Sequence, residues 1–170
     1  MSFRIHALPY APFAPLFELS DAALAEVGAS RSVVDSKPGF PCRVSLLDAE
    51  PGETVLLLNF EHQPAHSPYR ARHAIFVREN AEQAFPDIGS VPEVLASRLI
   101  SVRAFDERHF MVQADVVDGS DLCDSITGML GDRKVAYLHL HNAKPGCFAA
   151  SVTRGRSWTS TRTSAAGTKR

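Results

Sequence analysis

The chain has 170 residues, of which 45% are hydrophobic and 22% are charged, a composition typical of one soluble globular domain. No apolar run approaches the ~20 residues that a membrane-spanning helix requires, so we expect a cytoplasmic protein. The net charge of −1 is unevenly distributed, because Arg154–Arg170 holds five basic residues and no acidic one. The acidic remainder argues against nucleic-acid binding by the main domain.

The composition changes close to the C-terminus. We expect one domain over residues 1–154 and a basic, disordered tail over residues 155–170, which is rich in Ser, Thr, Gly and Arg. The three cysteines, Cys42, Cys123 and Cys147, show no CxxC spacing and do not suggest a disulfide framework. We expect each of them to pack as a small buried hydrophobic residue.

The first elements are a strand, a helix and a second strand. "FRIHAL" predicts a strand over residues 3–8. A helix is predicted over 21–27, with Ser20 as its N-cap and Gly28 as its end. Residues 31–35 suggest another short strand.

A hairpin is predicted next, from residues 42–47 and 53–60 around the turn-rich "DAEPG". Even-numbered positions of both segments are apolar, which predicts one buried face. Arg43 and Asn59 therefore fall on the opposite, odd-numbered face.

The twelve polar residues 61–72 are predicted to form a loop, and long loops are often functional. Tyr69 and Arg70 lie within it, close to Arg72 and His73. A guanidinium and a phenol at this place suggest binding of a carboxylate or phosphate. The alternative is a proline-stiffened surface loop whose arginines pair with acidic residues.

The second half alternates strands and helices. Strands are predicted over 73–79, 98–105 and 109–117, with short helices over 92–97 and 119–131. Residues 98–105 and 109–117 form a second predicted hairpin, in which even positions of both strands share a buried face.

The last predicted hairpin pairs residues 135–141 with 147–153. Its even positions are apolar, and the odd positions include His139, His141 and Cys147. A matching register sets His141 opposite Cys147 and His139 opposite Ala149, so the three reactive side chains share one face.

Three interpretations of that face stay open. The two imidazoles and the thiol suit zinc or copper, with a further ligand such as His73 or His62. Alternatively, His141 activates Cys147 as a nucleophile. The third interpretation is that these are half-exposed sheet residues without a chemical role.

Hairpins joined by short loops predict an α+β fold with a mostly antiparallel sheet and two to three short helices. The segments "PCRVSLLDAEPGETVLLLNFEHQPAHSPYRARHAIFVRE" and "HLHNAKPGCFAASVTR" resemble the bacterial domain-of-unknown-function family 1203. The likeness covers residues 3–154, implies a small bacterial single-domain protein, and brings no activity with it. Histidine at positions 73, 139 and 141 is not part of the likeness, so a histidine site would be a feature of this sequence.

The motifs GxGxxG, GxxxxGK, GxSxG, HExxH and the EF-hand loop are absent from the sequence, which disfavours nucleotide-dependent and serine-hydrolase chemistry. We expect a protein that binds a small polar or anionic ligand, in a pocket lined by Arg43, Asn59, Tyr69, Arg70 and His139. If the odd faces of the first and last hairpins adjoin, Arg43 and Asn59 share this pocket with His139, His141 and Cys147. One alternative is a non-catalytic homodimer formed through a sheet edge. The other is a metal-binding protein or Cys/His enzyme that uses the face defined above.

Overall fold

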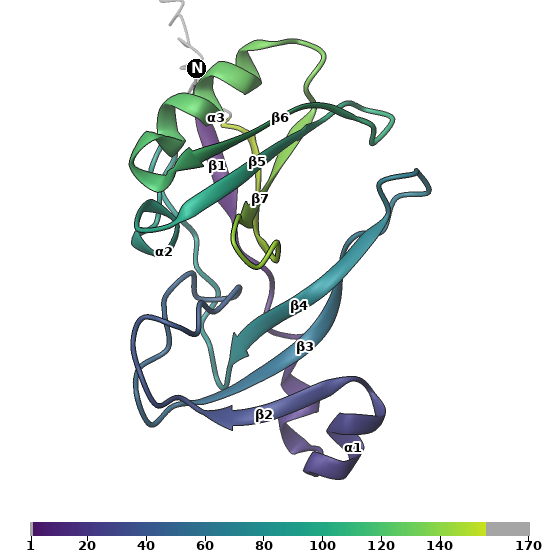
Figure 1. Cartoon of the computed structure of the whole chain (residues 1–170), viewed down its shortest axis with the longest axis vertical. Coiled ribbons are helices and arrows are strands. Elements are labelled where there is room, and N and C mark those ends of the chain that lie inside the picture. Colours follow the sequence, from purple (N-terminus) through teal and green to yellow (C-terminus); the bar gives the residue numbers. More distant parts are fainter. Residues whose placement is uncertain (1, 156–170) are drawn as a thin grey trace, which may run out of the picture.

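The computed structural model describes residues 2–155 and shows an α+β fold. Within this part of the chain, eight strands form two antiparallel sheets, accompanied by three short α-helices (Figure 1). The fold class expected from the sequence is confirmed. The predicted tail lies outside the described residues, except for Gly155.

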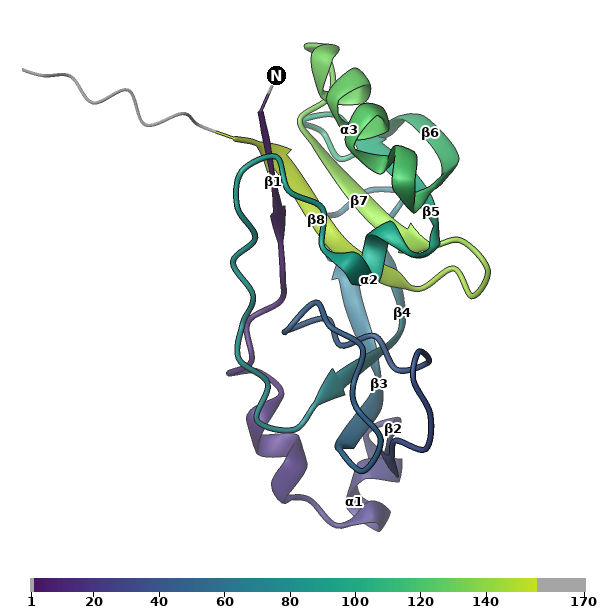
Figure 2. The ribbon, with the colours of Figure 1, turned by 90° about the vertical axis from the view of Figure 1, so that its left-hand side faces the viewer.

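The five-stranded sheet brings the first strand of the chain beside the last one (Figure 2). Its members, in the spatial order β1-β8-β7-β5-β6, are β1 (Phe3–His6), β8 (Phe148–Arg154), β7 (Tyr137–Asn142), β5 (Leu99–Phe105) and β6 (Met111–Asp118). Helix α3 (Leu122–Gly131) packs on one face. The apolar side chains of that face and of the helix form the larger core, which includes Val102, Leu138, Leu140, Val152, Leu122 and Ile126.

The three-stranded sheet has the order β2-β3-β4, with β2 (Ala29–Val33), β3 (Thr54–Gln63) and β4 (Ala71–Arg78). The 3-10 helix η1 (Ala14–Glu18) precedes helix α1 (Asp21–Glu26). As predicted, the Ser20 hydroxyl accepts a hydrogen bond from the Ala23 amide at 3.2 Å and caps α1. Gly28 follows the helix with φ +69°, a conformation that glycine adopts at little cost.

The predicted first hairpin is wrong. Residues 42–47 form no strand, and β3 pairs with β2 and β4 instead. The even positions Cys42, Val44 and Leu46 are buried as expected, but Arg43 is buried too. Val44 joins one core and Leu46 the other, and Arg43 and Ser45 are buried as well, so the alternation of apolar and polar residues does not indicate a strand with one exposed face.

The predicted buried face of the second hairpin is also wrong on one strand. A register shift between Ala104 and Phe105 sets Val102 opposite Asp115 and Ser101 opposite Val116. An irregularity of one residue exchanges the faces of a strand. Val116 is consequently 54% exposed on β6, an edge strand of the sheet.

The last hairpin keeps the predicted pairing of odd with odd and even with even positions as far as Leu140 but loses it at His141, and its register differs from the predicted one. His139 faces Ser151, and a further shift sets His141 opposite Phe148. Cys147 precedes β8. The histidines are buried, at 6% exposed for His139 and 1% for His141, so the expectation of half-exposed residues is wrong.

Two connections bring the sheets together. Strand β3 is longer than predicted, and Gln63 near its end donates a hydrogen bond to the Tyr137 hydroxyl at 2.7 Å. In the β3–β4 loop, Tyr69 packs edge-on against Phe105, with 6.0 Å between ring centroids. Helix α2 (Glu93–Ala96) and the 3-10 helix η2 (Gly119–Asp121) lie against one another beside the five-stranded sheet.

None of the described helices is both long and apolar enough to cross a membrane. Cys42 is buried, as expected, whereas Cys123 on α3 is exposed, contrary to expectation. Cys123 follows the buried Leu122 on α3, but adjacent residues of a helix point in different directions, so proximity to the apolar stripe does not bury it.

Candidate functional site

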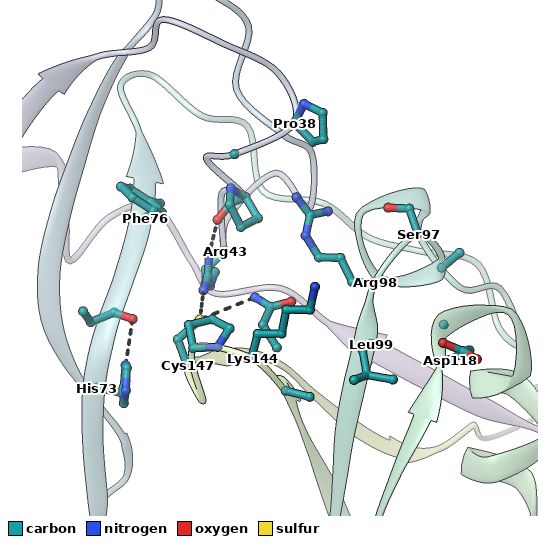
Figure 3. Close-up of a pocket in the computed structure, with 18 of the residues that line it drawn as sticks. Pro38, Arg43, His73, Phe76, Ser97, Arg98, Leu99, Asp118, Lys144 and Cys147 are labelled. Carbon is teal, nitrogen blue, oxygen red and sulfur yellow. Dashed lines mark hydrogen bonds between the residues drawn. The ribbon is translucent and has the colours of Figure 1, made fainter.

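A cavity of about 940 Å³ opens between the two sheets. Segments from both sheets form its walls. They are the loop around Pro38–Arg43, strands β3 and β4, the α2–β5 junction, η2 and the turn after β7. Figure 3 shows Arg43 and Cys147 close together, with Arg98 and Lys144 nearer the middle of the view and Asp118 on the far side. Residues distant in the sequence thus meet around one volume.

Arg43 is the central buried polar side chain of this cavity, at only 2% exposed. Its Nε donates to the Phe148 carbonyl at 2.7 Å, its Nη1 donates to the Pro41 carbonyl, and its Nη2 donates to Cys147 Sγ at 2.9 Å. Burial lowers the pKa of Arg43 from its ordinary value. Among residues 2–155 no carboxylate forms an ion pair with it, so neutral acceptors and the sulfur satisfy this guanidinium.

Cys147 lies at the end of the β7–β8 turn. Gly146, with φ +78°, reverses the chain, and the Asn142 amide donates to the Cys147 carbonyl at 2.9 Å. The sulfur also accepts a long contact from Asn142 Nδ2 at 3.5 Å (Figure 3). The turn therefore aims Sγ at Arg43, with two nitrogen donors around it.

Further cationic groups line the open part of the cavity. Arg98 Nη2 pairs with Asp48 at 2.6 Å, and its Nη1 donates to the Val94 carbonyl. Lys144 is exposed and forms no ion pair within the described part of the chain. His73 adds an imidazole and Asp118 a carboxylate, which leaves the cationic groups in excess.

Three histidines form a second constellation. His62 on β3 approaches His139 and His141 on β7, and one ring nitrogen of each lies within 4.8 Å of the others. The ring of His62 stacks on Phe148, with 5.3 Å between centroids and 6° between planes. Two strands from different sheets thus supply this cluster.

Burial is the largest cause of the lowered pKa values of the three histidines. It lowers the pKa of His62 and of His139 to about 4 each, and that of His141 to about 3. The guanidinium of Arg103 lowers all three pKa values further. At neutral pH the three rings are therefore uncharged, and each keeps a nitrogen lone pair.

The family described as "Protein of unknown function (DUF1203)" matches residues 39–154. The chain belongs to this family. No curated protein and no solved structure matches the chain. Both Arg43 and Cys147 and all three clustered histidines lie within the DUF1203 region, whereas β1, α1 and β2 precede it.

In this DUF1203 chain, the residues expected to share one pocket lie in three different parts of the structure. Arg43 and Cys147 line the cavity, whereas His139 and His141 belong to the histidine cluster, and Asn59 is exposed on β3. The hypothesis of one pocket for all five is therefore wrong. The cause is that 42–47 does not pair with β3, so the two odd faces do not adjoin.

The other predicted ligand-binding residues also lie away from the cavity. Tyr69 packs on Phe105 and Phe110, and Arg70 pairs with Glu61 at 2.7 Å on the surface. The structure thus shows the ion pair that the alternative interpretation of this loop expects. It leaves the cavity without a tyrosine in its lining.

The proposed Cys147–His141 hydrogen-bonded pair is not formed. His141 Nδ1 contacts the Gly146 carbonyl at 3.0 Å, and the Cys147 sulfur accepts from Arg43 instead. The predicted metal site of His139, His141 and Cys147 is not formed either. The third residue beside the two histidines is His62 and not Cys147.

Sequence reasoning did not identify Arg98, Lys144 or Asn142 as lining residues. They lie at the ends of strands, where no periodic pattern reports on burial, and only the tertiary fold joins them. His62 carried a weak signal, since its position was assigned to a loop that continues β3 in the structure.

Proposed function

We propose that this protein binds a small amphiphilic organic anion in the cavity between its two sheets. The observation that carries the proposal is a cavity of about 940 Å³ whose lining combines an excess of cationic groups with an apolar wall. Cavities of this size are typical of small-molecule sites.

The charge of the lining supports an anion. Arg43, Arg98 and Lys144 contribute three cationic side chains, against the carboxylates of Asp118 in the lining and of Asp48, which pairs with Arg98. Arg43 already has several neutral acceptors and acts as a fixed positive charge, whereas the charge of Arg98 is offset by its ion pair with Asp48. Lys144 is the cation free to turn toward a ligand.

The remaining wall supports an amphiphilic body. It is formed by prolines and by aliphatic and aromatic side chains, namely Pro38, Pro41, Leu57, Phe76, Ala96 and Leu99. Burying an apolar group there contributes about 25 cal/mol per Å² removed from water. A ligand with both a hydrocarbon part and an acidic group uses both features.

A fluorescence titration with anilinonaphthalene sulfonate tests the proposal, because this dye joins an apolar body to one anionic group. We expect saturable binding of one dye per chain. Lys144→Gln should weaken binding about fivefold, which corresponds to the loss of about 1 kcal/mol from one partly solvated charge pair.

Two controls separate charge from general hydrophobic binding. Lys134→Gln removes an exposed lysine outside the cavity and should leave the affinity unchanged. Phenylnaphthylamine, which lacks the sulfonate, should bind wild-type protein and Lys144→Gln equally. Absence of saturable dye binding, or equal affinities of the dye for wild-type protein and Lys144→Gln, would overturn the proposal.

A further inference from the structure

We propose that His62, His139 and His141 form a mononuclear site for a divalent transition-metal ion, with zinc as the ion that fits best. The inference is independent of the cavity, since none of the three histidines lines it. It assigns the ion to three imidazoles from two different strands and leaves one coordination position for a water molecule or an external ligand.

The spacing of the three ligands is close to that of a metal site. Nitrogens bound to zinc at about 2.0–2.1 Å in tetrahedral geometry lie about 3.3 Å apart. The three ring nitrogens already lie within 4.8 Å of one another. Small rotations of the rings about their side-chain bonds bring the nitrogens from the observed separation to the one that zinc requires.

The three side chains also carry nitrogen atoms without partners. His62 Nδ1, His139 Nδ1 and His141 Nε2 are buried, and within the described structure they have no hydrogen-bond partner. A buried polar atom without a partner costs about 1–3 kcal/mol. Three such atoms in one cluster indicate that a ligand completes it.

His141 is held as a metal ligand usually is. A carbonyl oxygen accepts hydrogen bonds and cannot donate them, so the 3.0 Å contact with Gly146 requires the proton on Nδ1. The lone pair is then on Nε2. An imidazole whose second nitrogen donates to a carbonyl is the usual outer-sphere arrangement around zinc.

The donor set selects the class of ion. Imidazole nitrogen suits zinc, copper, nickel and cobalt, whereas calcium and magnesium prefer oxygen ligands. Among residues 2–155 no carboxylate or thiol completes this cluster. Three histidines with an open position are a known zinc arrangement. The lowered pKa values agree with it, because a bound imidazole must be unprotonated.

Arg103 sets the charge beside the site. It stands directly opposite His139 in the pairing of β5 with β7, so the two side chains share a face of the sheet. Its guanidinium opposes the charge of a bare cation. An anionic external ligand on the metal, such as hydroxide, offsets that repulsion.

Zinc binding by the full chain without a histidine tag tests the inference, measured by competition with a chromophoric chelator. We expect one equivalent of zinc per chain. His62→Gln should weaken binding by more than about 100-fold, exceeding what loss of an outer-sphere partner costs. His66→Gln replaces an exposed histidine in the following loop and should bind like the wild type.

Cobalt substitution distinguishes the ligands. We expect the strong visible absorption of a four-coordinate ion, without the sulfur-to-cobalt charge-transfer band that a Cys147 ligand would add. Cys147→Ser should retain full binding. Loss of zinc in this variant, or a charge-transfer band in the wild type, would contradict the three-histidine site.

A second measurement distinguishes the loss of a zinc ligand from unfolding of the variant. His62 is less buried than the other two, and its variant is checked by circular dichroism. Zinc should raise the melting temperature of the wild type and of His66→Gln, but not that of folded His62→Gln. Less than a tenth of an equivalent bound from excess zinc, or unchanged affinity in His62→Gln, would overturn the inference.

Discussion

The Nη2 atom of Arg43 donates to the sulfur of Cys147 over 2.9 Å and joins two loops that are 104 residues apart. The same guanidinium binds the carbonyls of Pro41 and Phe148. A buried arginine without a carboxylate partner is satisfied here by neutral groups, so it holds its own segment, Pro41–Arg43, against the start of β8 at the edge of the cavity.

Removal of this guanidinium should therefore destabilise the fold. Arg43→Met keeps most of the apolar volume but removes the donor to the buried Phe148 carbonyl and to the partly buried Pro41 carbonyl, and we expect the free energy of unfolding to fall by about 3 kcal/mol. Urea denaturation measures it. Cys147→Ala removes only one acceptor and should cost less than Arg43→Met; a larger cost would show that the sulfur contact dominates.

The cavity wall near η2 depends on a glycine. A Cβ at Gly119 would lie 2.5 Å from the Ala96 carbonyl oxygen and close to that of Leu95. We expect Gly119→Ala to lower the free energy of unfolding by about 2–4 kcal/mol, because backbone atoms have to move.

Gly128→Ala is the control for Gly119→Ala. Gly128 lies within α3 and a Cβ there meets no atom within 4 Å. Gly128→Ala should stabilise the protein by about 0.5–1 kcal/mol through helix propensity. Thermal denaturation of both variants compares them, and a similar loss in the two would contradict the proposed backbone clash.

The register of β6 predicts unequal effects of substitution at two adjacent valines. Val116 is 54% exposed, whereas Val117 packs against the larger core. We expect Val116→Thr to change the free energy of unfolding by less than about 0.5 kcal/mol and Val117→Thr to lower it by about 1–2 kcal/mol. The reverse order in urea denaturation would indicate the unshifted pairing.

The histidine cluster predicts the pH dependence of stability in metal-free protein. The pKa values of His139 and His141 are about 4 and about 3 when folded, below the ordinary 6.5. Between pH 6.5 and 4 the unfolded chain therefore binds more protons, so stability is full above pH 6.5 and is lost as the pH falls.

These two residues together should lower the free energy of unfolding by about 3 kcal/mol between pH 6.5 and pH 5. Urea denaturation in the presence of a chelator at several pH values measures the decrease. His62, whose pKa is also lowered, adds to the measured decrease, so His139→Leu should remove less than half of the total. The leucine should pack against Phe105 and Phe148. An unchanged pH dependence in that variant would contradict the assigned shift.

Local patterns predicted much of the fold. Ser20 and Gly28 marked the ends of α1, and the alternation around Leu138 and Leu140 identified the core face of β7. The same alternation placed His139 and His141 on one face, because side chains two residues apart on a strand always share it.

The missing parts of the site depend on contacts between distant segments. His62 reaches the cluster only because β3 continues to Gln63, beyond the expected loop boundary. Cys147 leaves the histidine face because the chain turns at Gly146 before β8 begins. A shift of a single residue decides such assignments, and no local pattern reports it.

The pairing of β1 with β8 has a consequence for folding during synthesis. Phe3 stands opposite Arg154, so the first strand has no partner until almost the whole described chain has been made. At ordinary rates of translation this delay is on the order of ten seconds. The pairing of β1 with β8 is therefore completed last, and the five-stranded sheet forms in full only after both strands have been synthesised.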